Sequence, residues 1–108
     1  MIEVKIIEKS FWARLAAKKL KSHSVAIVFG TTIHLWNVDK ESFLANKAWL
    51  QHELEHVRQY RRYGFLPFLF LYFLEWVRHG YYQNKFEVAA RNAERNEFNN
   101  EFTLLNVN

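Results

Sequence analysis

The chain has 108 residues, the size of one domain, and half of them are hydrophobic and 18% aromatic, which excludes a disordered segment. Its net charge of +4 permits acidic partners, but no RNA- or DNA-binding motif accompanies the basic residues, so we expect no nucleic-acid partner. The chain has no cysteine, so disulfides and thiolate metal sites are excluded and any metal must be held by histidine and carboxylate side chains.

The first third of the chain predicts three short strands and one helix. Residues 2–7 alternate between charged and apolar side chains and predict a strand, and the helix that follows spans about 10–21. Residues 24–29 and 32–36 predict two more strands, which a tight turn joins as a hairpin. The N-terminus lacks the uninterrupted apolar core of a secretory signal, so a cytoplasmic location is the default expectation.

The middle of the chain predicts one long helix. The stretch from Lys40 to Tyr63 contains no Gly or Pro, and its apolar residues recur at helical spacing. Asp39 is a good N-cap for this helix, and Gly64 should end it.

The last third predicts two further helices, over 66–78 and 84–98, and a loosely ordered tail over 98–108. We therefore expect a single α+β domain over 1–108. In this fold a small antiparallel sheet or hairpin packs on the long middle helix, and the two C-terminal helices complete the core.

The run from Phe65 to Leu74 is uncharged and almost wholly apolar, but it is far shorter than the roughly 20 residues that a membrane span needs. No transmembrane segment is expected. A core helix packed on several sides is favoured over peripheral membrane contact through 65–76. A membrane-peripheral protein remains a third functional hypothesis, which a liposome flotation assay would separate from the others.

The long helix carries an H-E-x-x-H sequence at His52, Glu53 and His56. Two histidines about one helical turn apart project from the same face and can bind one zinc ion. Glu53 lies on the adjacent face, where its carboxylate can act as the general base toward a zinc-activated water. The alternative, two unrelated surface histidines, is less favoured because the pentapeptide lies within a predicted helix that follows a hairpin.

A third protein ligand is expected, because catalytic zinc sites supply three. The extended form of the motif would need Gly and His where Gln59 and Arg62 stand, so the third ligand lies elsewhere. We select Glu87, early in the last helix, since two His and one Glu is a common zinc ligand set. The alternative is a helix cap, in which the Glu87 carboxylate reaches back to the backbone of Asn84.

Three segments resemble small bacterial zincin-like metallopeptidases with a gluzincin-type site: HELEHVRQY at 52–60, GFLPF at 64–68 and NKFEVAAR at 84–91. The resemblance implies a minimal zincin-like fold, one bound Zn²⁺ and Glu87 as the third ligand. It also implies a peptide or protein substrate that is hydrolysed with Glu53 as general base.

Two functions compete on this basis. The first is a zinc metallopeptidase, and the second is a non-catalytic zincin-like module that uses the metal for stability or partner binding. Three side chains before the last helix could stabilise an oxyanion, although packing or surface roles are favoured for each: His79, Tyr81 and Tyr82. The predicted strand Thr32–Trp36 could bind an extended peptide by edge pairing.

Overall fold

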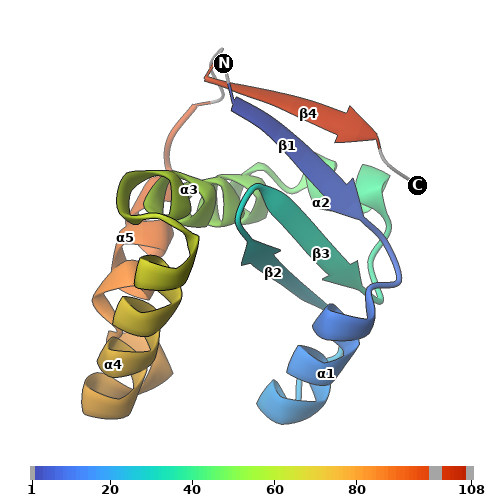
Figure 1. Ribbon diagram of the computed structural model, residues 1–108. Helices are drawn as coiled ribbons and strands as arrows, with labels where there is room; N and C mark the ends of the chain where they lie inside the picture. Colours follow the sequence, from blue (N-terminus) through green and yellow to red (C-terminus); the bar gives the residue numbers. More distant parts are fainter. Residues whose placement is uncertain (1, 98–100, 107–108) are drawn as a thin grey trace.

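The computed structural model describes residues 2–97 and 101–106 and shows an α+β fold, as the sequence predicts (Figure 1). Within these residues there are five helices and one four-stranded sheet. In chain order the elements are β1 (Ile2–Ile7), α1 (Phe11–Leu20), β2 (Val25–Phe29), β3 (Thr32–Trp36), α2 (Lys40–Ala45), α3 (Lys47–Tyr63), α4 (Phe65–Gln83), α5 (Lys85–Ala93) and β4 (Phe102–Asn106).

The sheet is mixed and has the strand order β2-β3-β1-β4. β2 and β3 form the predicted antiparallel hairpin, whereas β3 and β4 each run parallel to β1. The expectation of an antiparallel sheet was wrong beyond the hairpin, because α1 provides the crossover that a parallel pairing of β1 and β3 requires. As a result β2 lies at one edge of the sheet and β3 lies inside it.

The fourth strand corrects the expectation of a loosely ordered tail over 98–108. Residues 102–106 pair with β1, and the side chain of Phe102 is buried in the core. Phe102 also lies under the guanidinium of Arg58, 5.0 Å from the ring centroid. The parts of the expected tail at 98–100 and 107–108 lie outside the described residues.

The predicted single helix from Lys40 to Tyr63 is two helices, α2 and α3. Asn46 lies between them with non-helical backbone angles, and its side chain accepts a hydrogen bond from the backbone N–H of Trp49 at 3.1 Å. Asp39 caps α2 as predicted, since its carboxylate accepts from the N–H of Ser42 at 2.7 Å. Because Asn can end one helix and cap the next, the break occurred without the Gly or Pro on which the prediction depended.

The C-terminal helices differ in length from the prediction. α4 continues to Gln83 across a kink at Gly80, where φ is 79°, and α5 ends at Ala93 rather than near residue 98. α4 was expected to be packed on several sides, yet only Phe68 of this helix is fully buried. None of the described helices has the length and hydrophobicity that crossing a bilayer requires.

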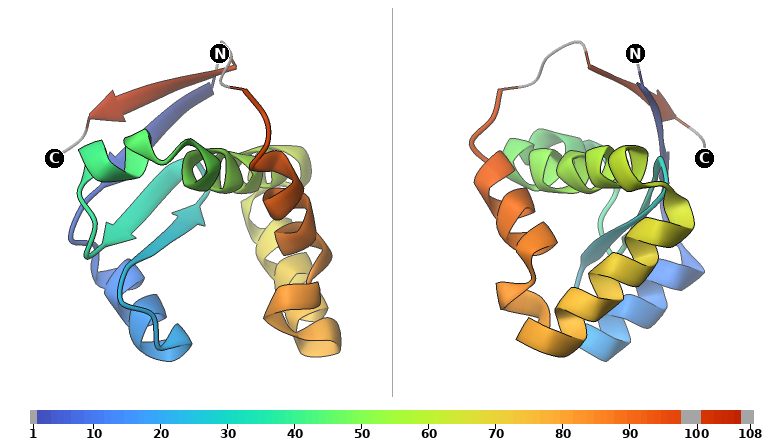
Figure 2. Two further views of the ribbon diagram at one scale, coloured as in Figure 1. Left: turned by 180° about the vertical axis from the view of Figure 1, so that it is seen from behind. Right: turned by 60° about the vertical axis from the view of Figure 1, so that its left-hand side comes forward.

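Helices pack on both faces of the sheet. Inward-facing Val4, Ile6, Ile33 and Leu35 form one core with the apolar side of α3. α1 packs on the opposite face, where Val25 of β2 meets two of its alanines. α4 and α5 pack on each other and on α3, away from the sheet (Figure 2). The middle helix α3 therefore contacts the sheet on one side and the C-terminal helices on the other.

Candidate metal centre

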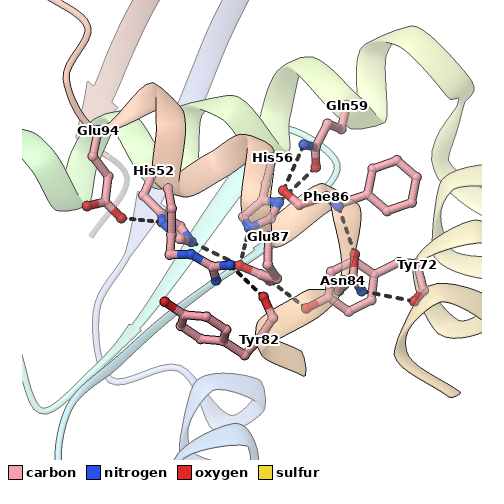
Figure 3. A network of polar contacts seen from close by, with 10 residues as sticks. His52, His56, Gln59, Tyr72, Tyr82, Asn84, Phe86, Glu87 and Glu94 are labelled. Atoms are coloured by element: carbon pink, nitrogen blue, oxygen red, sulfur yellow. Dashed lines mark hydrogen bonds and ion pairs between the residues drawn. The ribbon is translucent and has the colours of Figure 1, made fainter. Parts of the chain in front are cut away.

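The two histidines of the H-E-x-x-H sequence lie side by side on α3. Leu54 and Val57 of this helix are anchored in the core, which fixes its rotation about the axis. His52 and His56, one turn apart, then project together from the side that faces α5, and their ring centroids are 5.3 Å apart (Figure 3). The helix thus places two imidazoles against one point of the neighbouring helix.

Glu87 of α5 lies at that point. Its Oε1 atom is 3.0 Å from Nε2 of His52 and 3.2 Å from Nε2 of His56 (Figure 3). Donor atoms of the three side chains all lie within 4.8 Å of one another. The structure therefore brings together the three residues that the sequence selected as ligands.

The capping alternative for Glu87 does not occur in this geometry. Asn84 does cap α5, since its side chain accepts from the N–H of Phe86 at 2.8 Å. The backbone N–H of Asn84, however, donates to the carbonyl of Tyr81, and the Glu87 carboxylate is turned toward the histidines instead. The spacing of a capping arrangement is present, but only its first half forms.

The outer nitrogen of each histidine is held by an acceptor. Gln59 donates from Nε2 to the backbone carbonyl of Phe86 at 3.1 Å, so its Oε1 must face Nδ1 of His56, at 2.9 Å. Nδ1 of His52 lies 2.7 Å from a carboxylate oxygen of Glu94. Both Nδ1 atoms therefore carry a proton, and in the neutral form of each ring the Nε2 atom presents a lone pair toward Glu87.

With both rings neutral, three electron-pair donors converge with no hydrogen between them, and added positive charge, from protons or from a metal ion, stabilises this arrangement. The pKa values of the three side chains shift in the directions that this arrangement predicts. Burial by itself lowers the pKa of a histidine, but Glu87, Glu53 and Glu94 raise that of His52 to about 9. Glu87 likewise outweighs burial and raises the pKa of His56, while burial of Glu87 is outweighed by both histidines, which lower the pKa of its carboxyl group.

The donor set fits a zinc ion by type and by spacing. Two imidazole nitrogens and one carboxylate oxygen are ligands that zinc prefers, and hydrogen-bonded outer nitrogens are typical of metal-binding histidines. At zinc–ligand distances near 2.05 Å, tetrahedral ligands are about 3.3 Å apart. The two separations between Glu87 and the histidines, 3.0 and 3.2 Å, are close to this value, and all three donor atoms lie within 4.8 Å of one another.

Two phenols complete the surroundings of Glu87. Tyr72 of α4 donates its O–H to Oε2 of Glu87 at 2.5 Å, and burial together with that carboxylate raises the pKa of the Tyr72 hydroxyl (Figure 3). Burial and the charge of the nearby Glu87 also raise the pKa of the Tyr81 hydroxyl. Because Tyr72 engages Oε2, the carboxylate is oriented to offer Oε1 alone to the centre of the site.

Glu53 lies beside this cluster and belongs to the same cleft. Its side chain is buried, and this burial raises its pKa to about 7, although His56 and His52 act in the opposite direction. A carboxyl group with this pKa is half ionised near neutral pH, which suits it to accept and return a proton. Glu53 is not one of the three side chains whose donor atoms converge.

The site opens into an apolar cleft of about 340 Å³. Its walls come from α1, β2, α3, α4 and α5, and four of the five residues of β2 line it. β2 is the edge strand, so its outer edge lies along the cleft, whereas β3 is paired on both sides. The expectation that Thr32–Trp36 binds an extended peptide by edge pairing was therefore wrong, because strand order depends on tertiary contacts.

The other residues singled out in the sequence lie elsewhere. His34 contacts Ser10 at 2.8 Å, and burial lowers the pKa of its imidazole. His79 and Tyr82 are exposed and do not line the cleft; the Tyr82 ring lies 3.9 Å from the guanidinium of Arg91. Of the three candidates for oxyanion stabilisation, only Tyr81 lines the cleft.

Three contributors were not assigned from the sequence. Gln59 follows His56 by one turn on the same helix, a spacing that could have marked it as a partner. Tyr72 is the one hydroxyl-bearing side chain in the uncharged run from Phe65 to Leu74, a signal of the same kind. Glu94 has no such signal, because its contact with His52 arises only when α5 packs on α3.

Comparison with protein-family models, with curated proteins and with solved structures finds no match. The candidate site therefore rests on its own geometry. That geometry comprises three converging ligand atoms, of His52, His56 and Glu87, a hydrogen-bonded Nδ1 on each histidine and the buried carboxyl group of Glu53 beside them.

Proposed function

We propose that this protein binds one zinc ion through His52, His56 and Glu87 and hydrolyses peptide bonds. The observation that supports the proposal most directly is the convergence of two imidazole Nε2 atoms and one carboxylate oxygen, with each of the three side chains oriented by a further residue. The sequence resemblance to small bacterial zincin-like, gluzincin-type metallopeptidases points in the same direction. A zinc ion bound there would polarise a carbonyl group and lower the pKa of water.

Glu53 supplies the proton transfer in this proposal. Its pKa of about 7 leaves it able to take a proton from the attacking water at neutral pH and to pass that proton to the leaving amine. A site that used the metal only for stability would not require such a group. Glu53 therefore favours the peptidase over the non-catalytic zincin-like module.

The cleft provides the features that an extended peptide needs. The outer edge of β2 can pair with the backbone of a substrate, and this pairing would carry the substrate past Glu53. Tyr81, at the other wall, offers a hydroxyl donor for the oxygen of the attacked carbonyl. Because the cleft is mostly apolar, we propose that residues with apolar side chains are preferred next to the cleaved bond.

The test combines metal analysis with peptide cleavage. Protein purified without chelator should contain about one zinc per chain, and the His52→Ala and His56→Ala variants should contain far less. A mixed peptide library read by mass spectrometry should show cleavage by the wild type. Glu53→Gln should keep its zinc and lose at least about a hundredfold of the rate.

Glu55→Gln is the matched control, because Glu55 lies within the same pentapeptide but pairs with Arg58 at 3.0 Å instead of facing the site. It should cleave at the wild-type rate. Equal zinc content in the wild type and both histidine variants would overturn the metal site. Zinc binding without cleavage of any library member would leave the non-catalytic module as the function.

A further inference from the structure

The exposed apolar surface of the molecule is concentrated on two helices. Every large hydrophobic side chain that is exposed within residues 2–97 and 101–106 lies either in α1 or between residues 63 and 82. Scattered single exposures are ordinary in proteins, but a concentration of this kind marks a binding surface.

α4 contributes a continuous stripe. Leu66, Phe70, Phe73 and Val77 recur at helical spacing and are 72%, 62%, 54% and 64% exposed. The opposite side of the helix packs inward through Phe68. α4 is thus an apolar helix with one side left facing water, which no neighbouring element among the described residues covers.

α1 contributes the second part of the exposed apolar surface. Phe11, Trp12 and Leu15 are exposed on this helix, and Leu20 near its end is exposed and also lines the cleft. α1 and α4 both extend toward the lower side of the molecule in Figure 1, and residues of both helices line the cleft. Figure 2 shows the same arrangement from two other sides. Trp76 of α4 is likewise both exposed and part of the cleft wall, so the two apolar faces flank one opening.

The charged residues around these faces are almost all basic. α1 and the residue after it carry no acidic side chain, and the one carboxylate of α4, Glu75, accepts a hydrogen bond from the backbone N–H of Lys85. Besides Arg14, whose guanidinium lies 5.4 Å from the Trp36 ring centroid, the exposed basic side chains on or next to these helices are Lys18, Lys19, Lys21, Arg61, Arg62 and Arg78. None of these six forms an ion pair with another described residue.

We propose that the exposed faces of α1 and α4 bind the surface of an anionic lipid bilayer. Exposed Trp, Phe and Leu side chains bordered by Lys and Arg are the combination that interfacial helices use to enter the headgroup region of anionic membranes. A second copy of the chain is a poorer occupant, because a symmetric contact would set the same basic residues against each other. Binding is peripheral, since no described helix can span the bilayer.

Flotation with vesicles tests this proposal without reference to the metal site. The protein should float with phosphatidylcholine vesicles that contain phosphatidylserine, and much less with phosphatidylcholine alone. Added salt should weaken the binding, because it screens the basic residues. The double variant Leu66→Gln/Phe70→Gln should lose at least about tenfold in partitioning, since two exposed apolar anchors are removed.

Matched variants separate membrane binding from loss of fold. Leu66→Met/Phe70→Leu keeps both positions apolar and should bind close to the wild type. Lys18→Gln/Arg78→Gln should lose several-fold for each charge, whereas Lys47→Gln/Arg95→Gln removes two exposed charges away from these faces and should not. Circular dichroism confirms the fold of each variant.

Two results would overturn the proposal. The first is absence of flotation with the anionic vesicles. The second is flotation that the Leu66→Gln/Phe70→Gln variant retains in full. Concentration-dependent dimerisation that the same variant abolishes, without vesicle binding, would assign the surface to a second copy instead.

Discussion

Glu87 is the residue on which the candidate centre depends, because both of its oxygens are engaged and by different partners. Oε1 faces the two histidines and Oε2 accepts from Tyr72. A carboxylate fixed in this way offers one oxygen in a defined direction. Its neighbours should therefore influence metal affinity even though they are not ligands.

Tyr72→Phe tests that influence. The variant removes the hydroxyl that orients Glu87 but keeps the ring, which packs near Phe68 and Phe86. Zinc affinity, measured by competition with a chromophoric chelator, should fall about 10- to 100-fold. Tyr82→Phe, at an exposed position outside the cleft, should leave the affinity unchanged. Equal affinities in the two variants would show that Tyr72 does not orient the ligand.

Glu87→Gln distinguishes ligation from capping. The amide keeps the size of the side chain and loses its charge, so zinc affinity should fall strongly. Helicity by circular dichroism should stay at the wild-type value, because the N–H of Asn84 already donates to Tyr81 and not to Glu87. Lower helicity with unchanged zinc affinity would contradict this assignment.

The sequence could predict part of the site because that part is local. His52, Glu53 and His56 lie within one helical turn, so helix geometry alone places them together. Glu87 is 31 residues beyond His56, and its selection required ligand chemistry and a family resemblance. Glu94 acts through the packing of two helices, which no local pattern encodes.

At the scale of elements, the break at Asn46 separates α2 and α3 into two helices. It allows Phe43 of α2 to enter the core, where its ring lies 5.2 Å from that of Trp49. The residues around Asn46 read as continuous helix because none of them is Gly or Pro. A side chain that satisfies the backbone at the start of the second helix made the break possible.

Asn46→Ala should lower the free energy of unfolding by about 1 kcal/mol, the usual cost of losing a helix cap. Asn46→Asp, which can accept the same hydrogen bond from the N–H of Trp49, should cost much less. Urea denaturation followed by circular dichroism measures both values. If the two variants were equally stable, the side chain of Asn46 would not be what starts α3.

The exposed stripe of α4 shows the limit of reading elements from composition. An uncharged run predicts burial, because apolar side chains are usually inside. Burial of a helix on several sides, however, needs neighbours on several sides, and α4 packs mainly against α3 and α5. The sequence predicted the helix but not the number of its neighbours.

At the scale of the whole molecule, the sheet joins residues from both ends of the described chain. β4 covers β1, Phe102 enters the core, and Glu101 binds the guanidinium group of Arg58 on α3 at 3.0 Å. These contacts couple the last strand to the helix that carries the histidines. The prediction of a tail failed because a short apolar strand among Asn residues is stabilised by distant partners, namely β1 about a hundred residues earlier and Arg58 on α3.

Phe102→Ala should lower the free energy of unfolding by about 3–5 kcal/mol, the cost of emptying a buried aromatic site. Phe102→Leu fills most of the volume and should cost less. Zinc affinity of the folded variants should match the wild type, since Phe102 does not contact the ligands. A small stability loss in Phe102→Ala would mean that β4 contributes little to the core.

The pairing of β1 with β4 also means that β1 must wait for one of its neighbours during translation. β1 is made first, but one of its two neighbours is translated only after about a hundred further residues, roughly 5–20 s later at ~5–20 residues per second. During that interval one edge of β1 is open to other chains. Glu3 and Lys5 lie on the exposed face of β1, and their charges discourage such pairing until β4 is made.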